Sequence, residues 1–317
     1  MKTNYRSVYT AFDPYPSRKG SAIHIEKASQ VLSLKYGRTL LLTLPKQVRN
    51  RIKRPIKHLQ FELSESNYLT RAQLYSKWVD DILNSQLHVK IGHFRDIWGV
   101  DESKIRVISN GATIPKAMRK LAGLPDQYII YFGALQPWQG VDILLKAMQY
   151  LQDKPEIKLV ICSSHKARLS KPYQKLATRL GIEQQVIWRH KLKKQTLYSI
   201  LGHAKASIVP LTECNRNLKQ GCSPLKIFES MACKVPLIAS DIPVVREILE
   251  QNRDARLVRP DRPAELARAI RLFIDYPRMG ESLAENAFEK LSQNYTWANI
   301  DAQLSDFYDK LVESIYA

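Results

Sequence analysis

Residues 221–241 read GCSPLKIFESMACKVPLIASD, and this stretch decides the fold of the chain around it. Ser223 is a good N-cap and Pro224 a good first helical residue, so we expect a helix to start here with its amide groups exposed. Helix-patterned residues then run from Leu225 to Ala232. The apolar run Pro236–Ser240 follows with the composition of a buried strand.

The expected helix start is suited to binding an anion. Free amides and the helix dipole attract negative charge, and Lys226 in the first turn adds a full positive charge, which suits a diphosphate. Glu229 lies on the same face, roughly 4.5 Å further along the axis. Its carboxylate can accept two hydroxyl hydrogen bonds, as a ribose diol would offer. The same residues also fit an ordinary capped helix with a surface Lys and Glu.

The alternation of strand and helix extends through the second half of the chain. Such a pattern is typical of βαβ units around a parallel sheet, with a ligand site at the carboxyl ends of the strands. The expected strands are Tyr128–Phe132, Lys158–Cys162, Gln185–Trp188, Ala206–Leu211, Pro236–Ser240 and Arg256–Val258. Expected helices include Val141–Leu151, Tyr173–Leu180, Thr196–Ala204, Leu225–Ala232 and Val244–Glu250.

The first half begins in the same way and then becomes irregular. Residues 92–103 carry no helical period, although a parallel crossover needs at least that many residues and normally spends them on a helix. This half is therefore short. The expected strands are Ser7–Ala11, Thr39–Thr43, His58–Leu63, Leu87–Ile91 and Lys104–Ser109, and the expected helices are Ala22–Leu34 and Leu69–Leu83.

Composition sets the broad class of protein. The 317 residues include 49 Lys and Arg against 30 Asp and Glu, a net charge of +19. This length suggests about two domains. No apolar run approaches the ~20 residues of a membrane-spanning helix and the first residues lack a signal-peptide core, so we expect a cytoplasmic protein. The basic balance favours an anionic partner, whether nucleic acid, acidic lipid or phosphorylated substrate.

The four cysteines point away from a metal or disulfide framework. Cys162, Cys214, Cys222 and Cys233 form no CxxC pair, so we expect neither a zinc site nor disulfides.

Four segments resemble one enzyme family in its own order. Residues 223–241 resemble the donor-binding signature of the family 4 retaining glycosyltransferases, which have the two-domain GT-B fold. Residues 131–140 resemble the first strand and phosphate loop of the family's donor domain, and residues 107–112 its interdomain strand. Residues 14–24 resemble the glycine loop of its acceptor domain.

The resemblance implies an α/β GT-B fold of two Rossmann-like domains with parallel sheets. Residues 1–116 would form the acceptor-side domain, shortened and incomplete, and residues 117–294 the nucleotide-sugar donor domain. The helix-patterned segment 295–317 would pack on the first domain.

The implied activity is transfer of a sugar, with retention, from a nucleotide-diphosphate sugar to an acceptor hydroxyl in polysaccharide or glycolipid synthesis. The acceptor would be a polysaccharide or lipid-linked, and no metal or other cofactor is expected. The competing interpretation is a catalytically impaired nucleotide-sugar-binding remnant that serves as a partner protein. Nucleic acid is not expected as a partner, because the charges are dispersed and no known nucleic-acid module is recognisable.

The resemblance also assigns roles to residues of this sequence. Gly20 and Gly133 would let backbone approach the donor, although Gly133 also fits a plain turn. His93 would place a hydrogen-bond acceptor near the sugar, although it also fits a structural His beside Trp98. Lys226 would stabilise charge on the leaving diphosphate. The implied catalytic residues are His93 and Lys226, and the implied donor-binding residues are Gly20, Gly133, Gln136, Gln139, Ser223, Pro224, Leu225, Lys226 and Glu229.

Three positions depart from the family pattern. Many members carry an Arg and a Lys on the diphosphate where this chain has Ala134 and Gln139. Gly221 stands where the first of two paired glutamates would be, which leaves the sugar specificity open. Charge compensation would then come from the helix amides and from Lys226, Lys166 or Arg189.

The basic run from Lys46 to Lys57 has two interpretations. It fits a solvated loop, and it also fits contact with an anionic membrane at its inner face, where each Lys or Arg contributes roughly 1 kcal/mol. The first 116 residues hold 20 basic and 9 acidic residues, a net charge of +11, which places more than half of the chain's excess charge in this part.

Overall fold

The structure is a computed structural model that describes residues 7–14, 30–31, 34, 39–44, 57–60, 108–218 and 224–316. For the three strands in the first sixty residues and for residues 311–316 it describes the backbone alone. The chain divides into two compact units. Of the described residues, 111–218 and 224–296 form the larger unit, and the early strands, residues 108–110 and the last helix form the smaller one.

The larger unit is built on a parallel sheet of six strands in the order β6-β5-β4-β7-β8-β9. All six strands expected from the sequence are confirmed, each end within two residues of its expected position. Their bounds are β4 Tyr128–Gly133, β5 Lys158–Ser163, β6 Val186–His190, β7 Ala206–Val209, β8 Leu237–Ser240 and β9 Arg256–Val258.

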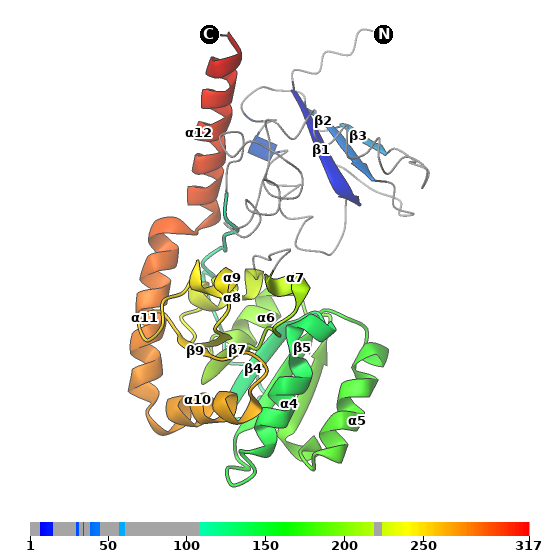
Figure 1. Cartoon of the computed structure of the whole chain (residues 1–317), viewed down its shortest axis with the longest axis vertical. Coiled ribbons are helices and arrows are strands. Elements are labelled where there is room, and N and C mark those ends of the chain that lie inside the picture. Colours follow the sequence, from blue (N-terminus) through cyan, green and yellow to red (C-terminus); the bar gives the residue numbers. More distant parts are fainter. Residues whose placement is uncertain are drawn as a thin grey trace. The chain divides into compact units, whose positions relative to one another are not determined.

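Helices flank this sheet on both faces (Figure 1). Side chains alternate along β4. Ile129 and Tyr131 pack with helices α4 (Val141–Gln149) and α10 (Pro263–Asp275), while Ile130 and Phe132 pack with α6 (Lys194–Leu201) on the other face. The helices are α4 Val141–Gln149, α5 Lys171–Arg179, α6 Lys194–Leu201, α7 Asn215–Leu218, α8 Leu225–Ala232, α9 Pro243–Arg246, α10 Pro263–Asp275 and α11 Pro277–Asn294. Short 3-10 helices are η3 Pro137–Gln139, η4 Ala167–Ser170 and η5 Glu183–Gln185.

One expected helix is wrong in length. The sequence predicts a helix to Glu250, but α9 ends at Arg246 because the chain turns there. The Asp254 carboxylate accepts a hydrogen bond from the Glu250 amide at 3.0 Å, which holds this turn. Helices α10 and α11 were not assigned from the sequence, although each begins with a proline, Pro263 and Pro277, at its first position.

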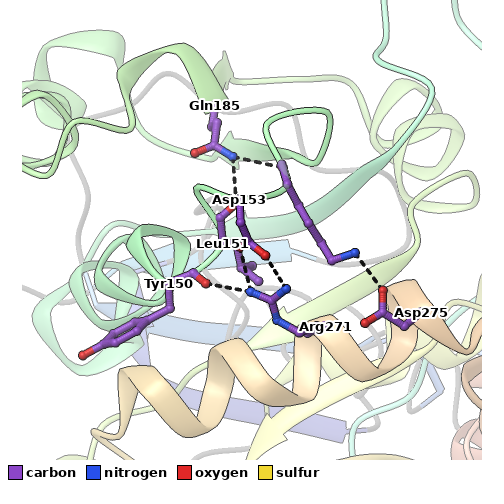
Figure 2. A network of polar contacts seen from close by, with 7 residues as sticks. Tyr150, Leu151, Asp153, Gln185, Arg271 and Asp275 are labelled. Atoms are coloured by element: carbon purple, nitrogen blue, oxygen red, sulfur yellow. Dashed lines mark hydrogen bonds and ion pairs between the residues drawn. The ribbon is translucent and has the colours of Figure 1, made fainter.

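A polar network ties α10 to the turn between α4 and β5 (Figure 2). The Arg271 guanidinium donates to both oxygens of Asp153, at 2.6 and 2.8 Å, and to the Tyr150 carbonyl at 3.0 Å. Lys154 pairs with Asp275 at 2.8 Å. The Arg271 hydrogen bond holds the pKa of Asp153 below its usual range. Because exposed pairs contribute little to stability, this network chiefly fixes the position of α10 on its neighbour α4.

The smaller unit contains three parallel strands in the order β1-β2-β3, with bounds β1 Ser7–Pro14, β2 Thr39–Leu44 and β3 Lys57–Gln60. The first two expected strands are confirmed, and β3 overlaps the third. Residues 30–31 and 34 are helical, within the helix expected from Ala22. The expected helix Leu69–Leu83 and strand Leu87–Ile91 lie outside the described residues. So do all but two residues of the expected strand Lys104–Ser109, and Ile108 and Ser109 form no strand.

The last helix, α12 Trp297–Tyr316, confirms the helical pattern expected at this end. It buries a stripe at i, i+4 and i+8 consisting of Ile300, Leu304 and Tyr308. No helix within the described ranges is both long and apolar enough to cross a membrane.

Backbone packing at Gly140 predicts a sharp effect of substitution. Gly140 and Gly123 both have positive φ, +67° and +74°, but a Cβ on Gly140 would lie 1.7 Å from the Pro210 carbonyl oxygen, whereas Gly123 has nothing within 4 Å. Both alanine variants add left-handed strain, and only Gly140→Ala adds a backbone clash. We expect Gly140→Ala to lower the free energy of unfolding by about 1–3 kcal/mol more than Gly123→Ala in urea denaturation. Equal losses in the two variants would contradict the close approach.

Candidate functional site

The order of the strands in the six-stranded sheet indicates where the candidate site lies. Strands β4, β5 and β6 follow one another towards one edge, whereas β7 returns to the other side of β4, so the order reverses between β4 and β7. In open parallel sheets a crevice forms outside the carboxyl ends of the strands at such a point. Gly133 ends β4, and the chain after β7 leads through α7 to α8. The segment singled out in the sequence therefore starts its helix beside this crevice.

Lys226 lies at the centre of the site. It is only 8% exposed, and its Nζ donates a hydrogen bond to Gln139 Oε1 at 2.5 Å. The same Nζ lies 4.2 Å from the centre of the Tyr131 ring, a cation–π contact. A Cβ on Gly133 would lie 3.5 Å from Nζ. The structure thus brings together Gly133, Gln139 and Lys226, three of the residues implied by the resemblance.

The turn after β4 depends on a glycine. Gly133 has a φ of +125°, which only glycine adopts readily. The Tyr131 hydroxyl donates to the Ala134 carbonyl at 2.6 Å, and burial raises the pKa of Tyr131, so this donor stays neutral. Gln136 precedes η3 as its N-cap, and its carbonyl accepts from the Gln139 amide at 2.9 Å. Because its backbone is fixed by η3, Gln139 presents its side chain to Lys226.

Glu229 belongs to a second group of residues between α8 and α6. Its Oε1 lies 3.5 Å from the Tyr198 hydroxyl, which donates to it, and 3.9 Å from Lys194 Nζ. Burial raises the pKa of Glu229, and the charges of Lys194 and Lys226 and the Tyr198 hydrogen bond oppose that rise. Lys194 also lies 5.3 Å from the centre of the Tyr198 ring. Sequence reasoning missed both partners, because the contact depends on how two helices lie side by side.

The start of α8 differs by one residue from the prediction. Pro224 is the N-cap, with an extended ψ of 99°, and Leu225 is the first helical residue, so the expectation that Pro224 begins the helix is wrong. The expected N-cap, Ser223, lies outside the described residues. One turn into the helix, Ser230 Oγ donates to the Lys226 carbonyl and accepts from the Ser207 hydroxyl, each at 2.7 Å. These buried bonds fix α8 against β7.

The loop that leads to α8 is fastened to η3. Asn217 is fully buried, and its Nδ2 donates to the carbonyls of Trp138 and Thr212 at 2.9 and 2.8 Å. The Arg216 guanidinium lies 5.9 Å from the centre of the Trp138 ring. These contacts, which the sequence did not reveal, fix the position of the loop before α8 relative to η3.

Several implied residues are not part of this group. Gly20, His93 and Gly221 lie outside the described residues. Lys166 and Arg189, offered as alternative sources of positive charge, are exposed residues beside η4 and in β6. Within the described ranges, no three His, Cys, Asp or Glu side chains gather as metal ligands would, and Cys162, Cys214 and Cys233 are free thiols.

Comparison with known proteins places this site in context. The family model described as glycosyl transferases group 1 matches residues 115–290, more than half of the chain. A D-inositol 3-phosphate glycosyltransferase from Streptomyces coelicolor is 29% identical over 212 residues, which cover 62% of this chain and 44% of that protein. The chain spans about half the length of the curated relatives it matches.

Solved structures match over nearly the whole chain. A glycosyltransferase from Rickettsia africae ESF-5 has a TM-score of 0.77 at 14% identity and covers 98% of this chain and 99% of its own. Anabaena HepE, solved in complex with UDP and glucose, has a TM-score of 0.69 at 14% identity, with 96% and 99% covered. At these identities the likeness shows the fold, and it confirms the expected α/β GT-B class. The shortening of the first domain stays a prediction.

The environment of Glu229 predicts a pH-dependent stability with a defined sign. Because its folded pKa is raised, protonated Glu229 stabilises the fold at low pH, and this contribution is lost as pH rises through the unfolded and then the folded pKa. Glu229→Gln is uncharged throughout, so we expect its Tm relative to wild type to rise between about pH 4 and about pH 8.

Glu265 supplies a control of opposite sign. The Arg259 amide, at 3.0 Å, and the Arg259 guanidinium, at 2.8 Å, hold the pKa of Glu265 below its usual range. Its contribution to stability is therefore present above the unfolded pKa and lost as pH falls. The Tm of Glu265→Gln relative to wild type should fall as pH rises from about 2 to about 5 and stay level above that pH. If both variants moved in the same direction, the buried environment assigned to Glu229 would be wrong.

Proposed function

Because the chain belongs to the glycosyl transferases group 1 family, we propose that it transfers a sugar from a nucleotide-diphosphate sugar to an acceptor hydroxyl. The observation that carries this proposal is the position of Lys226 beside Gly133 and Gln139 at the crevice between β4 and β7. A diphosphate there would meet an ammonium group and open backbone. HepE, which shares the fold and was solved with UDP and glucose, supports a nucleoside diphosphate as the donor group.

The residues of the site take complementary roles in this proposal. Lys226 stabilises the charge that develops on the departing diphosphate. Gln139 places a side-chain amide where many family members have a lysine. The glycine at position 133 lets the backbone approach the phosphate. Glu229 accepts hydrogen bonds from the ribose hydroxyls. The remaining donor contacts proposed are Gly20, Gln136, Ser223, Pro224 and Leu225.

The proposed reaction retains configuration at the anomeric carbon. The bond from that carbon to the diphosphate oxygen breaks, and the acceptor oxygen bonds to the carbon from the same face. The acceptor proton passes to the departing phosphate oxygen, so the charges balance without a metal ion in the proposed step. His93 is proposed to lie near the sugar, and it is outside the described residues.

The acceptor is proposed to be a polysaccharide or a lipid-linked molecule, in polysaccharide or glycolipid synthesis in the cytoplasm. Residues 1–116 would recognise it and residues 117–294 would hold the donor. The basic run Lys46–Lys57 would then face the inner surface of an anionic membrane. The fold shared with a glycosyltransferase structure over 98% of this chain supports the two Rossmann-like domains that such an enzyme would need.

Removal of the Lys226 charge tests the donor site. We expect Lys226→Met to weaken UDP binding roughly 10- to 100-fold in isothermal titration, because a charge-assisted bond to the diphosphate is lost. Lys146→Met is the matched control, since Lys146 pairs with Asp142 on the exposed face of α4. An equal loss of affinity in both variants, or no loss in Lys226→Met, would show that Lys226 does not bind the diphosphate.

Turnover distinguishes the enzyme from the remnant. UDP-, GDP- and ADP-sugars are titrated against the full chain, and donor hydrolysis is followed for each sugar that binds. We expect one nucleotide to bind and its sugar to be released slowly, because water substitutes for the missing acceptor. Binding without any hydrolysis favours the remnant, and absence of binding by all three would refute both interpretations.

A further inference from the structure

One segment of the larger unit is basic and carries no acidic residue. Between residues 164 and 182 the chain has no Asp or Glu. Five cations in this segment, all exposed, form what is called the α5 face below: Lys166, Arg168, Lys171, Lys175 and Arg179. Lys166 precedes η4 as its N-cap, Arg168 lies on η4, and the other three lie on α5. None belongs to the group around Lys226 or to the basic run of the first half. Their charge is therefore not explained by the proposed reaction.

The three cations of α5 lie on one side of the helix. Lys171, Lys175 and Arg179 follow one another at i, i+4 and i+8, so they lie on one side of α5 over about 12 Å. The opposite side is anchored, because Ala177 is buried and Leu176 packs against the core. The helix contacts α4 and lies at the edge of this unit (Figure 1). The cations consequently point away from the core as a fixed row.

The α5 face gathers cations without counterions in one segment. Other cations of the unit meet carboxylates, as Arg271 meets Asp153 and Lys154 meets Asp275 (Figure 2). Lys234 and Lys290 likewise pair with acidic residues. None of the five cations of the α5 face forms an ion pair with a residue in the described ranges. Like charges held in a row repel one another, and an external anionic surface would relieve that repulsion.

An aliphatic side chain projects within this charged surface. Leu169 is 47% exposed and lies between Arg168 and Lys171. Its backbone is fixed, since the next residue, Ser170, is fully buried and its Oγ donates to the Ala167 carbonyl at 2.7 Å. Exposed leucine surrounded by Lys and Arg is the composition with which proteins enter the boundary between lipid headgroups and acyl chains.

We propose that the α5 face binds the surface of an anionic lipid bilayer, with Leu169 entering the acyl boundary and the five cations contacting phosphate headgroups. Nucleic acid offers phosphates too. However, proteins that bind single strands add aromatic side chains on which bases stack, and the exposed apolar residue here is a leucine. The observations therefore favour lipid. The inference does not depend on the donor site, and it places a membrane contact on the larger unit.

The test measures sedimentation of the full chain with vesicles of phosphatidylcholine alone or mixed with phosphatidylglycerol. The wild type should bind the mixed vesicles and not the neutral ones. The triple variant Lys171→Gln, Lys175→Gln, Arg179→Gln should lose on the order of 100-fold in partitioning, because each cation contributes about fivefold. Leu169→Ser should lose about fivefold, a loss that persists at high salt because it is apolar.

A control variant with the same change in net charge distinguishes binding by the α5 face from attraction by the overall positive charge of the chain. Lys116, Arg119 and Arg278 are exposed cations elsewhere on the larger unit. Changing all three to Gln should lower partitioning less than about threefold, since charges distant from the bilayer are screened. Circular dichroism melts check that each variant is folded. Equal losses in the two triple variants, or binding to neutral vesicles as well, would overturn the proposal. The proposal would also be overturned if duplex or single-stranded DNA displaced the chain from the mixed vesicles and Leu169→Ser did not change binding to them.

Discussion

The hydrogen bond from the Lys226 ammonium to the Gln139 side-chain oxygen joins the two helical segments on which the site depends. Gln139 belongs to η3, directly after β4, and Lys226 to α8, which follows β7. These two strands are neighbours in the sheet although more than seventy residues separate them in the sequence. The reversal of strand order between them creates the crevice, and the bond spans it. The Asn217 contacts to Trp138 and Thr212 reinforce the same connection from the backbone.

Much of the larger unit could be predicted from the sequence, because buried parallel strands are short β-branched runs separated by amphipathic helices. The strand ends shifted by up to two residues, as at Gln185–Trp188 against β6 Val186–His190. The shortened α9 could not be foreseen, since a carboxylate from Asp254 ends it through a turn. Helices α10 and α11 begin at Pro263 and Pro277, and proline at the first helical position is the signal by which the sequence marks both starts.

The site was predictable in part for a related reason. Residues at the carboxyl ends of parallel strands meet at one edge, so Gly133, Gln139 and Lys226 could be expected to come together. The partners of Glu229 could not. Tyr198 and Lys194 reach it from α6, and the contact depends on the register between two helices that cover the sheet, which no sequence spacing records.

The link between Arg271 and Asp153 also bears on how the chain is made. These residues lie 118 positions apart, and α10 covers the same face of the sheet as α4. During synthesis at the ribosome, Ile129 and the other apolar residues on that face must wait until α10 has emerged. At ordinary translation rates the wait is roughly 10 s. The nascent larger unit thus spends that interval with an incomplete core, in the period when chaperones bind exposed apolar surface.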